Sequence, residues 1–134
     1  MKKTVLLVTA VAAAALAPAA LQAKPKLTGQ QQLDKILEGR VAGKPISCIT
    51  LMDSRDMQII DKTAIVYKSG STIYVNRTTD PQRLDSDQIL VSKIWGSDVC
   101  NLDTIQLHER SMGTWTGFVG LVDFVPYRKP EKAN

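Results

Sequence analysis

His108, the single histidine, is the residue best suited to general-base chemistry, and Asp103 and Ser111 stand close to it in sequence. The segment from Asp103 to Glu109 alternates polar and apolar residues, which predicts a half-buried strand. Asp103 and Ser111 lie at odd spacings from His108, so in a regular strand their side chains point to the opposite face. We therefore expect no local catalytic triad, and we expect His108 on the solvent face.

Asp123 interrupts the otherwise apolar run 118–125, FVGLVDFV. Such a run predicts a strand that is covered on both faces, where a carboxylate must be paired, perturbed or placed at an end. We expect Asp123 near the strand end, bonded to a neighbouring loop. A hydrolase site that combines Asp123 with the distant His108 is the alternative.

No metal site is expected, because one histidine cannot supply a zinc centre when the two cysteines are joined in a disulfide. The acidic stretch with Asp80, Asp85 and Asp87 lacks the glycine and terminal glutamate of a calcium loop. The sequence also has no phosphate-binding glycine loop, nucleophile elbow or dinucleotide fingerprint, so no cofactor is expected.

Trp95 and Trp115 flank two glycine-containing loops. We expect their rings to cap the core, with one polar atom exposed; the alternative is that they line a partner surface. The candidate residues for such a binding surface are Trp95, Trp115, His108 and Asp123.

The two cysteines, Cys48 and Cys100, predict a disulfide, because an even count is typical of domains in oxidising compartments. A redox or metal-binding role is the alternative, but the C-x-x-C spacing is absent. A bridge across this loop would stabilise the domain by about 4 kcal/mol.

Residues 1–23 read as a signal peptide, with Lys2 and Lys3 followed by an alanine-rich apolar stretch and a small-residue cleavage site at Ala23. An uncleaved membrane anchor is the alternative. We expect a periplasmic or secreted protein of a Gram-negative bacterium, with no membrane span after cleavage. Loss of the two lysines lowers the net charge from +4 to +2, which predicts no nucleic-acid partner.

Residues 24–127 predict one β-rich domain with a helix over about 28–38, and residues 128–134 a polar tail. Thr28 and Gln31 form a capping box, and Gly39 ends the helix. Short β-rich runs separated by turn residues then follow. We predict a mainly β fold, an antiparallel sandwich or small barrel of about six or seven strands. The runs are Ile46–Met52, Met57–Ile60, Thr63–Lys68, Thr72–Arg77, Ile89–Trp95, Asp103–Glu109 and Gly117–Val125.

Several short motifs together resemble a family of small exported alphaproteobacterial proteins, of sphingomonad type, to which no activity is assigned. The motifs are GRVAGKP at 39–45, CIxL at 48–51, AIVY at 64–67, IYVNR at 73–77, GS before Cys100 and DFVPY at 123–127. The resemblance implies an exported domain with two cysteines and no catalytic residue.

We therefore expect a non-enzymatic binding or interaction module whose partner is an unidentified protein or envelope component. Its longest loops, Thr78–Gln88 and Ser111–Thr116, are the expected contact segments. The alternatives are the hydrolase described above and a structural envelope component.

Overall fold

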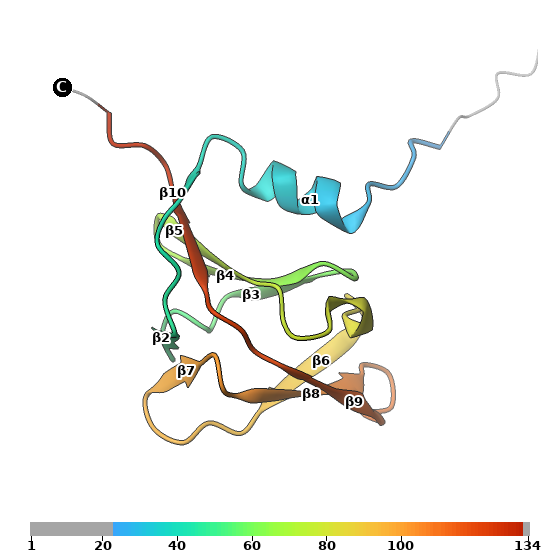
Figure 1. Cartoon of the computed structure of the whole chain (residues 1–134). Helices are drawn as coiled ribbons and strands as arrows, with labels where there is room; N and C mark the ends of the chain where they lie inside the picture. The colour runs from blue at the N-terminus through green and yellow to red at the C-terminus, as the bar shows by residue number, and fades with distance from the viewer. Residues whose placement is uncertain (1–22, 133–134) are drawn as a thin grey trace, which may run out of the picture.

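The computed structural model describes residues 23–132, which form one helix packed on a layered arrangement of antiparallel sheets (Figure 1). A five-stranded sheet with the order β1-β10-β5-β4-β3 forms the middle layer. Helix α1 covers one face, and two smaller sheets, β2-β7 and β6-β8-β9, cover the other. The elements are α1 (Gly29–Ile36), β1 (Val41–Ala42), β2 (Cys48–Thr50), β3 (Met57–Ile60), β4 (Ala64–Ser69), β5 (Thr72–Asn76), the 3-10 turn η1 (Pro81–Arg83), β6 (Gln88–Ser92), β7 (Asp98–Cys100), β8 (Thr104–Glu109), β9 (Trp115–Gly120) and β10 (Val125–Arg128).

Helix α1 begins with the predicted capping box. The Thr28 side chain accepts from the Gln31 backbone N–H, and the Gln31 side chain accepts from the Thr28 N–H. Two of the orphan donors of the first turn are thereby paired. The helix is short, with Leu37 as its C-cap and Gly39 in the left-handed region at φ +69°, so it ends two residues before the predicted boundary.

The middle sheet is buried on both faces because it separates two apolar cores. The core beneath α1 is built around Leu33 of the helix and alternate residues of β3, β4 and β5. The core on the other face contains Tyr67 and Phe124, whose rings meet edge to face at 5.7 Å between centroids. This explains why β4 buries four consecutive residues, Ala64 to Tyr67, instead of alternating.

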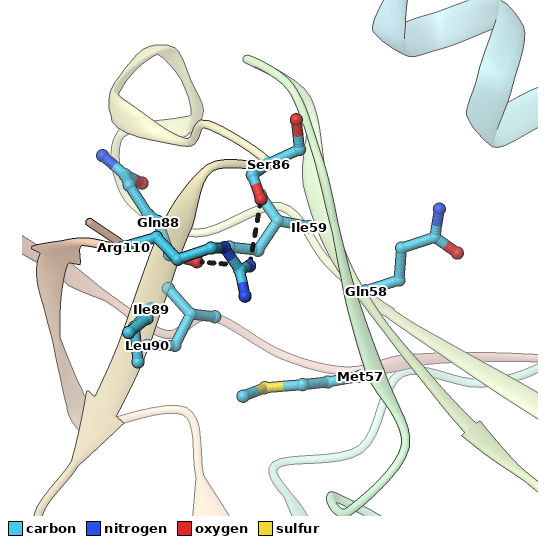
Figure 2. A pocket seen from close by; sticks show the side chains of 8 residues that line it. All are labelled: Met57, Gln58, Ile59, Ser86, Gln88, Ile89, Leu90 and Arg110. Atoms are coloured by element: carbon cyan, nitrogen blue, oxygen red, sulfur yellow. Dashed lines mark hydrogen bonds between the residues drawn. The ribbon is translucent and has the colours of Figure 1, made fainter.

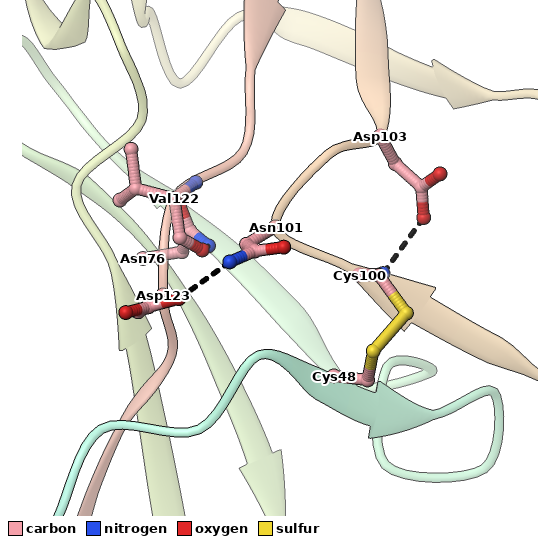
Figure 3. The surroundings of a disulfide bond; sticks show 7 residues. All are labelled: Cys48, Asn76, Cys100, Asn101, Asp103, Val122 and Asp123. Atoms are coloured by element: carbon pink, nitrogen blue, oxygen red, sulfur yellow. Dashed lines mark hydrogen bonds between the residues drawn. A yellow bond between two sulfur atoms is a disulfide. The ribbon is translucent and has the colours of Figure 1, made fainter.

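Strands β2 and β7 are held together by the predicted disulfide between Cys48 and Cys100 (Figure 3). The backbone N–H of Asn101 donates to Ser47 O, so the next pair along, Cys48 opposite Cys100, is a non-hydrogen-bonded pair. Such pairs bring the Cα atoms closest together, and here they are 4.0 Å apart. The disulfide thus follows directly from the strand register.

A buried side-chain amide, that of Asn76 at the end of β5, holds the segment that connects the small sheets to the middle sheet. Asn76 is fully buried; its Nδ2 donates to Val122 O (2.5 Å), and its Oδ1 accepts from the N–H groups of Val122 (3.2 Å) and Thr78 (3.0 Å). These bonds replace backbone pairing where the 121–124 segment is no longer paired with a strand. Every donor and acceptor of the Asn76 amide except one N–H takes part in them.

Asp53 links the loop after β2 to the β4–β5 hairpin. The Ser69 hydroxyl donates to one carboxylate oxygen, and the Thr50 hydroxyl donates to the other at 2.8 Å. The hydrogen bond from Ser69, and then that from Thr50, lower the pKa of Asp53 below its ordinary value.

The mainly β fold with an N-terminal helix is confirmed, but within residues 23–132 the sheets do not close into a barrel, and they contain ten strands instead of six or seven. Two short strands, β1 and β7, fall where the sequence predicted connections. The apolar run 117–125 is not one strand covered on both faces, because it divides into β9, a crossing segment and β10. The predicted polar tail also begins one residue later, since Arg128 pairs with Val41 as part of β10.

The predicted signal peptide, residues 1–23, lies outside the described residues except for Ala23. Within residues 23–132, no helix is long and apolar enough to cross a membrane. Both ends of the described chain lie on the side of α1, whereas the β6-β8-β9 sheet lies at the opposite end of the molecule (Figure 1).

Candidate functional site

The outer face of the β6-β8-β9 sheet carries two rows of side chains that face solvent. One row runs Val91, Gln106 and Phe118 across the three strands. Directly opposite residues on one face of a sheet have Cβ atoms about 5 Å apart, so each row is a continuous surface. We call this surface the aromatic face; its second row runs Ile89, His108 and Trp115.

The aromatic face is apolar at its margins and polar along its centre. Trp115 and Phe118 on β9 are 58% and 61% exposed, and Ile89 and Val91 on β6 are 41% and 44% exposed. The inward residues of the central strand β8 are buried, while its outward residues are polar. Surfaces that bind a protein partner are typically enriched in exposed aromatic side chains that lie beside polar hydrogen-bonding groups.

A β-bulge places Trp115 and Phe118 on the same face. They are three residues apart, and in a regular strand an odd spacing puts side chains on opposite faces. The register shifts between Leu107 and His108, so that Thr116 is the extra residue, and its hydroxyl donates to Leu107 O at 3.1 Å. Gly117 permits the bend with φ +139°.

His108 stabilises the β8–β9 turn. Its Nδ1 lies 2.9 Å from Gly113 O, and since a carbonyl only accepts, Nδ1 carries the proton in this bond. Its Nε2 lies 3.4 Å from Gln106 Oε1, and since both atoms are acceptors in the neutral tautomer that bonds Gly113, they do not form a hydrogen bond. His108 therefore bonds to the hairpin through Nδ1, and its Nε2 keeps an acceptor site for another donor.

The residues near His108 in sequence do not form a catalytic arrangement with it. Asp103 accepts from the Cys100 backbone N–H at 2.7 Å, at the other end of β8 (Figure 3). Ser111 bonds to Glu109 instead. Hydrogen bonds lower the pKa of the Glu109 carboxyl, the largest effect coming from the Ser111 hydroxyl and smaller ones from the backbone N–H groups of Ser111 and Met112.

Asp123 lies where the sequence predicted, in the segment between β9 and β10, and it is exposed. Its Oδ1 accepts from Asn101 Nδ2 at 2.6 Å, beside the disulfide (Figure 3). The segment that carries Asp123 lies at the Asp103 end of β8, since the Leu121 N–H donates to Asp103 O at 2.9 Å. His108 lies near the other end of that strand, so the structure does not bring Asp123 and His108 together.

The expectation that the two tryptophans cap the core is wrong. Trp95 is 83% exposed on the β6–β7 connection, with Lys93 Nζ 5.2 Å from its ring centroid. Trp115 lies on the aromatic face. Of the four candidate surface residues, only Trp115 and His108 are neighbours, and Phe118, Ile89 and Val91 complete the surface that sequence reasoning missed.

The loop expected to bind a partner, Thr78–Gln88, is packed onto the domain instead. Its Leu84 is 1% exposed within the core, and Leu84 O accepts from the Lys62 N–H at 2.9 Å. Among residues 23–132, no cluster of three or more metal-ligating side chains is present.

No protein-family model, curated protein sequence or solved structure matches this chain.

Proposed function

We propose that this chain is a non-enzymatic binding module of the bacterial cell envelope, exported to the periplasm or beyond it, that holds a protein partner on its aromatic face. The observation that carries the proposal is the pair of cross-strand rows that expose Trp115 and Phe118 beside Gln106 and His108. Isolated exposed apolar residues are common on protein surfaces, but an aligned group of them marks an interaction site.

Three properties of the face support a protein partner. Its aromatic side chains supply large contact area at a low cost in side-chain entropy. Its central groups, the Gln106 amide and the His108 ring, can exchange hydrogen bonds with a partner. The sheet behind it is rigid, because Ile105, Leu107 and Val119 on its inner side are buried in the core.

Export is supported by the sequence of residues 1–23 and by the disulfide, since structural disulfides persist in oxidising compartments. The resemblance to small exported alphaproteobacterial proteins agrees with this location. The net charge gives no reason to expect nucleic acid as the partner.

Site-specific photo-crosslinking in the native host tests the proposal. A photoreactive phenylalanine analogue at Phe118 is expected to form a discrete adduct with one envelope protein. The matched control places the analogue at Val41, which is equally exposed (61%) but lies on the middle sheet. The proposal predicts that Trp115→Ala reduces the adduct at position 118. Equal adducts at both positions, or none at 118, would contradict it.

A further inference from the structure

Two sheet edges face each other across a cleft that no strand fills. Strand β3 ends the middle sheet and β6 ends the β6-β8-β9 sheet, and in the described part of the chain neither has a neighbour on its outer side. Between them lies a cavity of about 370 Å³, lined by both strands and by Ser86 and Arg110 (Figure 2). We call this cleft the seam.

The edge of β3 presents unpaired backbone groups to the seam. Asp56 O accepts from the Lys68 N–H, which makes that pair a hydrogen-bonded one. Because pairs alternate along an antiparallel ladder, Gln58 and Ile60 also bond to β4. The N–H and C=O groups of Met57 and Ile59 therefore point away from β4.

The edge of β6 is arranged in the same way. Asp87 O accepts from the Arg110 N–H, so Ile89 and Val91 are the residues that bond to β8. The backbone groups of Leu90 and Ser92 point outward on the open side of β6. An open edge of this kind is a template for another strand.

Apolar side chains line the seam beside these backbone groups. Met57 and Ile59 point from β3 toward β6, while Gln58 points away (Figure 2). Met57 is 44% exposed, whereas Ile59 and Leu90 are partly buried against the core. An added strand would therefore gain apolar contacts from every second side chain.

Arg110 places a positive charge at one end of the seam. One guanidinium nitrogen, Nη2, donates to Ser86 O and Gln88 O, each at 3.3 Å (Figure 2). The structure gives the guanidinium no ion pair; within residues 23–132 the one ion pair found joins Arg83 to Asp80. Its remaining N–H groups are free to take a carboxylate, the anion whose geometry a guanidinium matches.

We propose that the seam binds an extended acidic peptide segment of a partner protein as an added strand. The peptide backbone pairs with the open edges of β3 and β6, alternate apolar side chains lie over Met57 and Leu90, and a carboxylate pairs with Arg110. This site adjoins the aromatic face at Ile89, which also lines the cavity, but Trp115 and Phe118 of that face are not among the residues that line the seam.

The test uses fluorescence anisotropy with synthetic peptides of about nine residues, the length of a long strand. One peptide alternates Val and Thr around two Asp residues, and a second carries Lys in place of Asp. The acidic peptide is expected to bind at least about tenfold more tightly, the value of one charge-assisted hydrogen bond. Equal binding of the two peptides, or no binding of the acidic one at about 1 mM, overturns the proposal.

Two variants locate the carboxylate contact. Arg110→Gln should remove the preference for the acidic peptide. Arg77→Gln, which deletes the same charge beside Gln30 of α1, should keep it. A preference that survives in Arg110→Gln overturns the role of Arg110, and circular dichroism shows whether each variant is folded.

Amide hydrogen exchange locates the added strand. Saturation with the acidic peptide should slow exchange at Ile59, Leu90 and Ser92, and a peptide N-methylated at alternate residues should not bind. Protection confined to β9 would overturn the assignment. Trp115→Ala should leave peptide binding unchanged, so failure of the aromatic face and failure of the seam are separate results.

Discussion

Replacing Asn76 by alanine is expected to destabilise the domain by about 3 kcal/mol, far more than an average substitution of a polar residue. The change removes one donor and one acceptor that together serve three backbone groups: Val122 O, Val122 N–H and Thr78 N–H. Leaving a buried polar group without a partner costs about 1–3 kcal/mol, and the lower value for each of the three gives the estimate.

The Asn76 contact also holds a strained residue in place. Thr78 is β-branched and adopts φ +55°, a left-handed conformation that such residues avoid. Its N–H is fixed by Asn76 Oδ1, so loss of the amide removes the bond that holds this conformation.

Urea unfolding monitored by circular dichroism measures the effect. With a slope of about 1.5 kcal/mol per molar urea, a loss of about 3 kcal/mol lowers the midpoint by about 2 M. Asn101→Ala is the matched control, since it removes a single bond to Asp123 between exposed side chains and should shift the midpoint by less than about 0.5 M. Equal shifts for the two variants would refute the reasoning.

Asn76→Asp adds a check on mechanism. A protonated carboxyl can donate to Val122 O as the amide does, whereas a carboxylate cannot. Burial raises the folded-state pKa of an introduced carboxyl above its unfolded value of about 3.9, so the variant should lose stability relative to the native chain as the pH rises above about 4. A stability difference that does not change with pH would contradict this account.

Three further predictions follow from other contacts. Gly29→Ala should destabilise by about 1–3 kcal/mol, although alanine favours helices, because the new Cβ would clash with Thr63 Oγ1 and Asp61 O; a stabilised variant in urea unfolding would refute this. Asp53→Asn should be less stable than the native chain above about pH 4, and the difference should vanish as the pH falls through the lowered pKa of Asp53, as unfolding from pH 2 to 7 will show. Replacing Cys48 and Cys100 by serine should lower stability by up to about 4 kcal/mol, and reduction of the native chain should lower its melting temperature in the same direction.

Features that depend on neighbouring residues were readable in the sequence. The capping box at Thr28 and the strand Met57–Ile60 were predicted with the bounds that the structure has. The disulfide was also predicted, from the even number of cysteines. In each case the prediction rests on residue types whose preferred geometry is known without the rest of the fold: a helix cap, the turn residues that bound a strand, or a pair of cysteines.

Features that depend on register across strands were not readable. The prediction that Trp115 caps the core treated it as an aromatic residue beside a loop, whereas β9 begins at Trp115 and the bulge at Thr116 turns its ring to the outer face. The bulge leaves only a weak local signal, an aromatic residue followed by Thr116-Gly117. Strand β7 was missed because three residues form a strand only through pairing with β2. The seam requires the order of strands in two sheets, which no local pattern gives.

The position of the chain ends determines how this protein can be attached to other molecules. Both ends of the described chain emerge on the α1 side, and the β6-β8-β9 sheet, whose outer side is the aromatic face, lies at the opposite end (Figure 1). A tether at either end, whether an immobilising tag, a fused domain or a retained membrane anchor, would therefore present the aromatic face outward. The same geometry allows the domain to be displayed on a bead or a cell surface with its proposed binding face unobstructed.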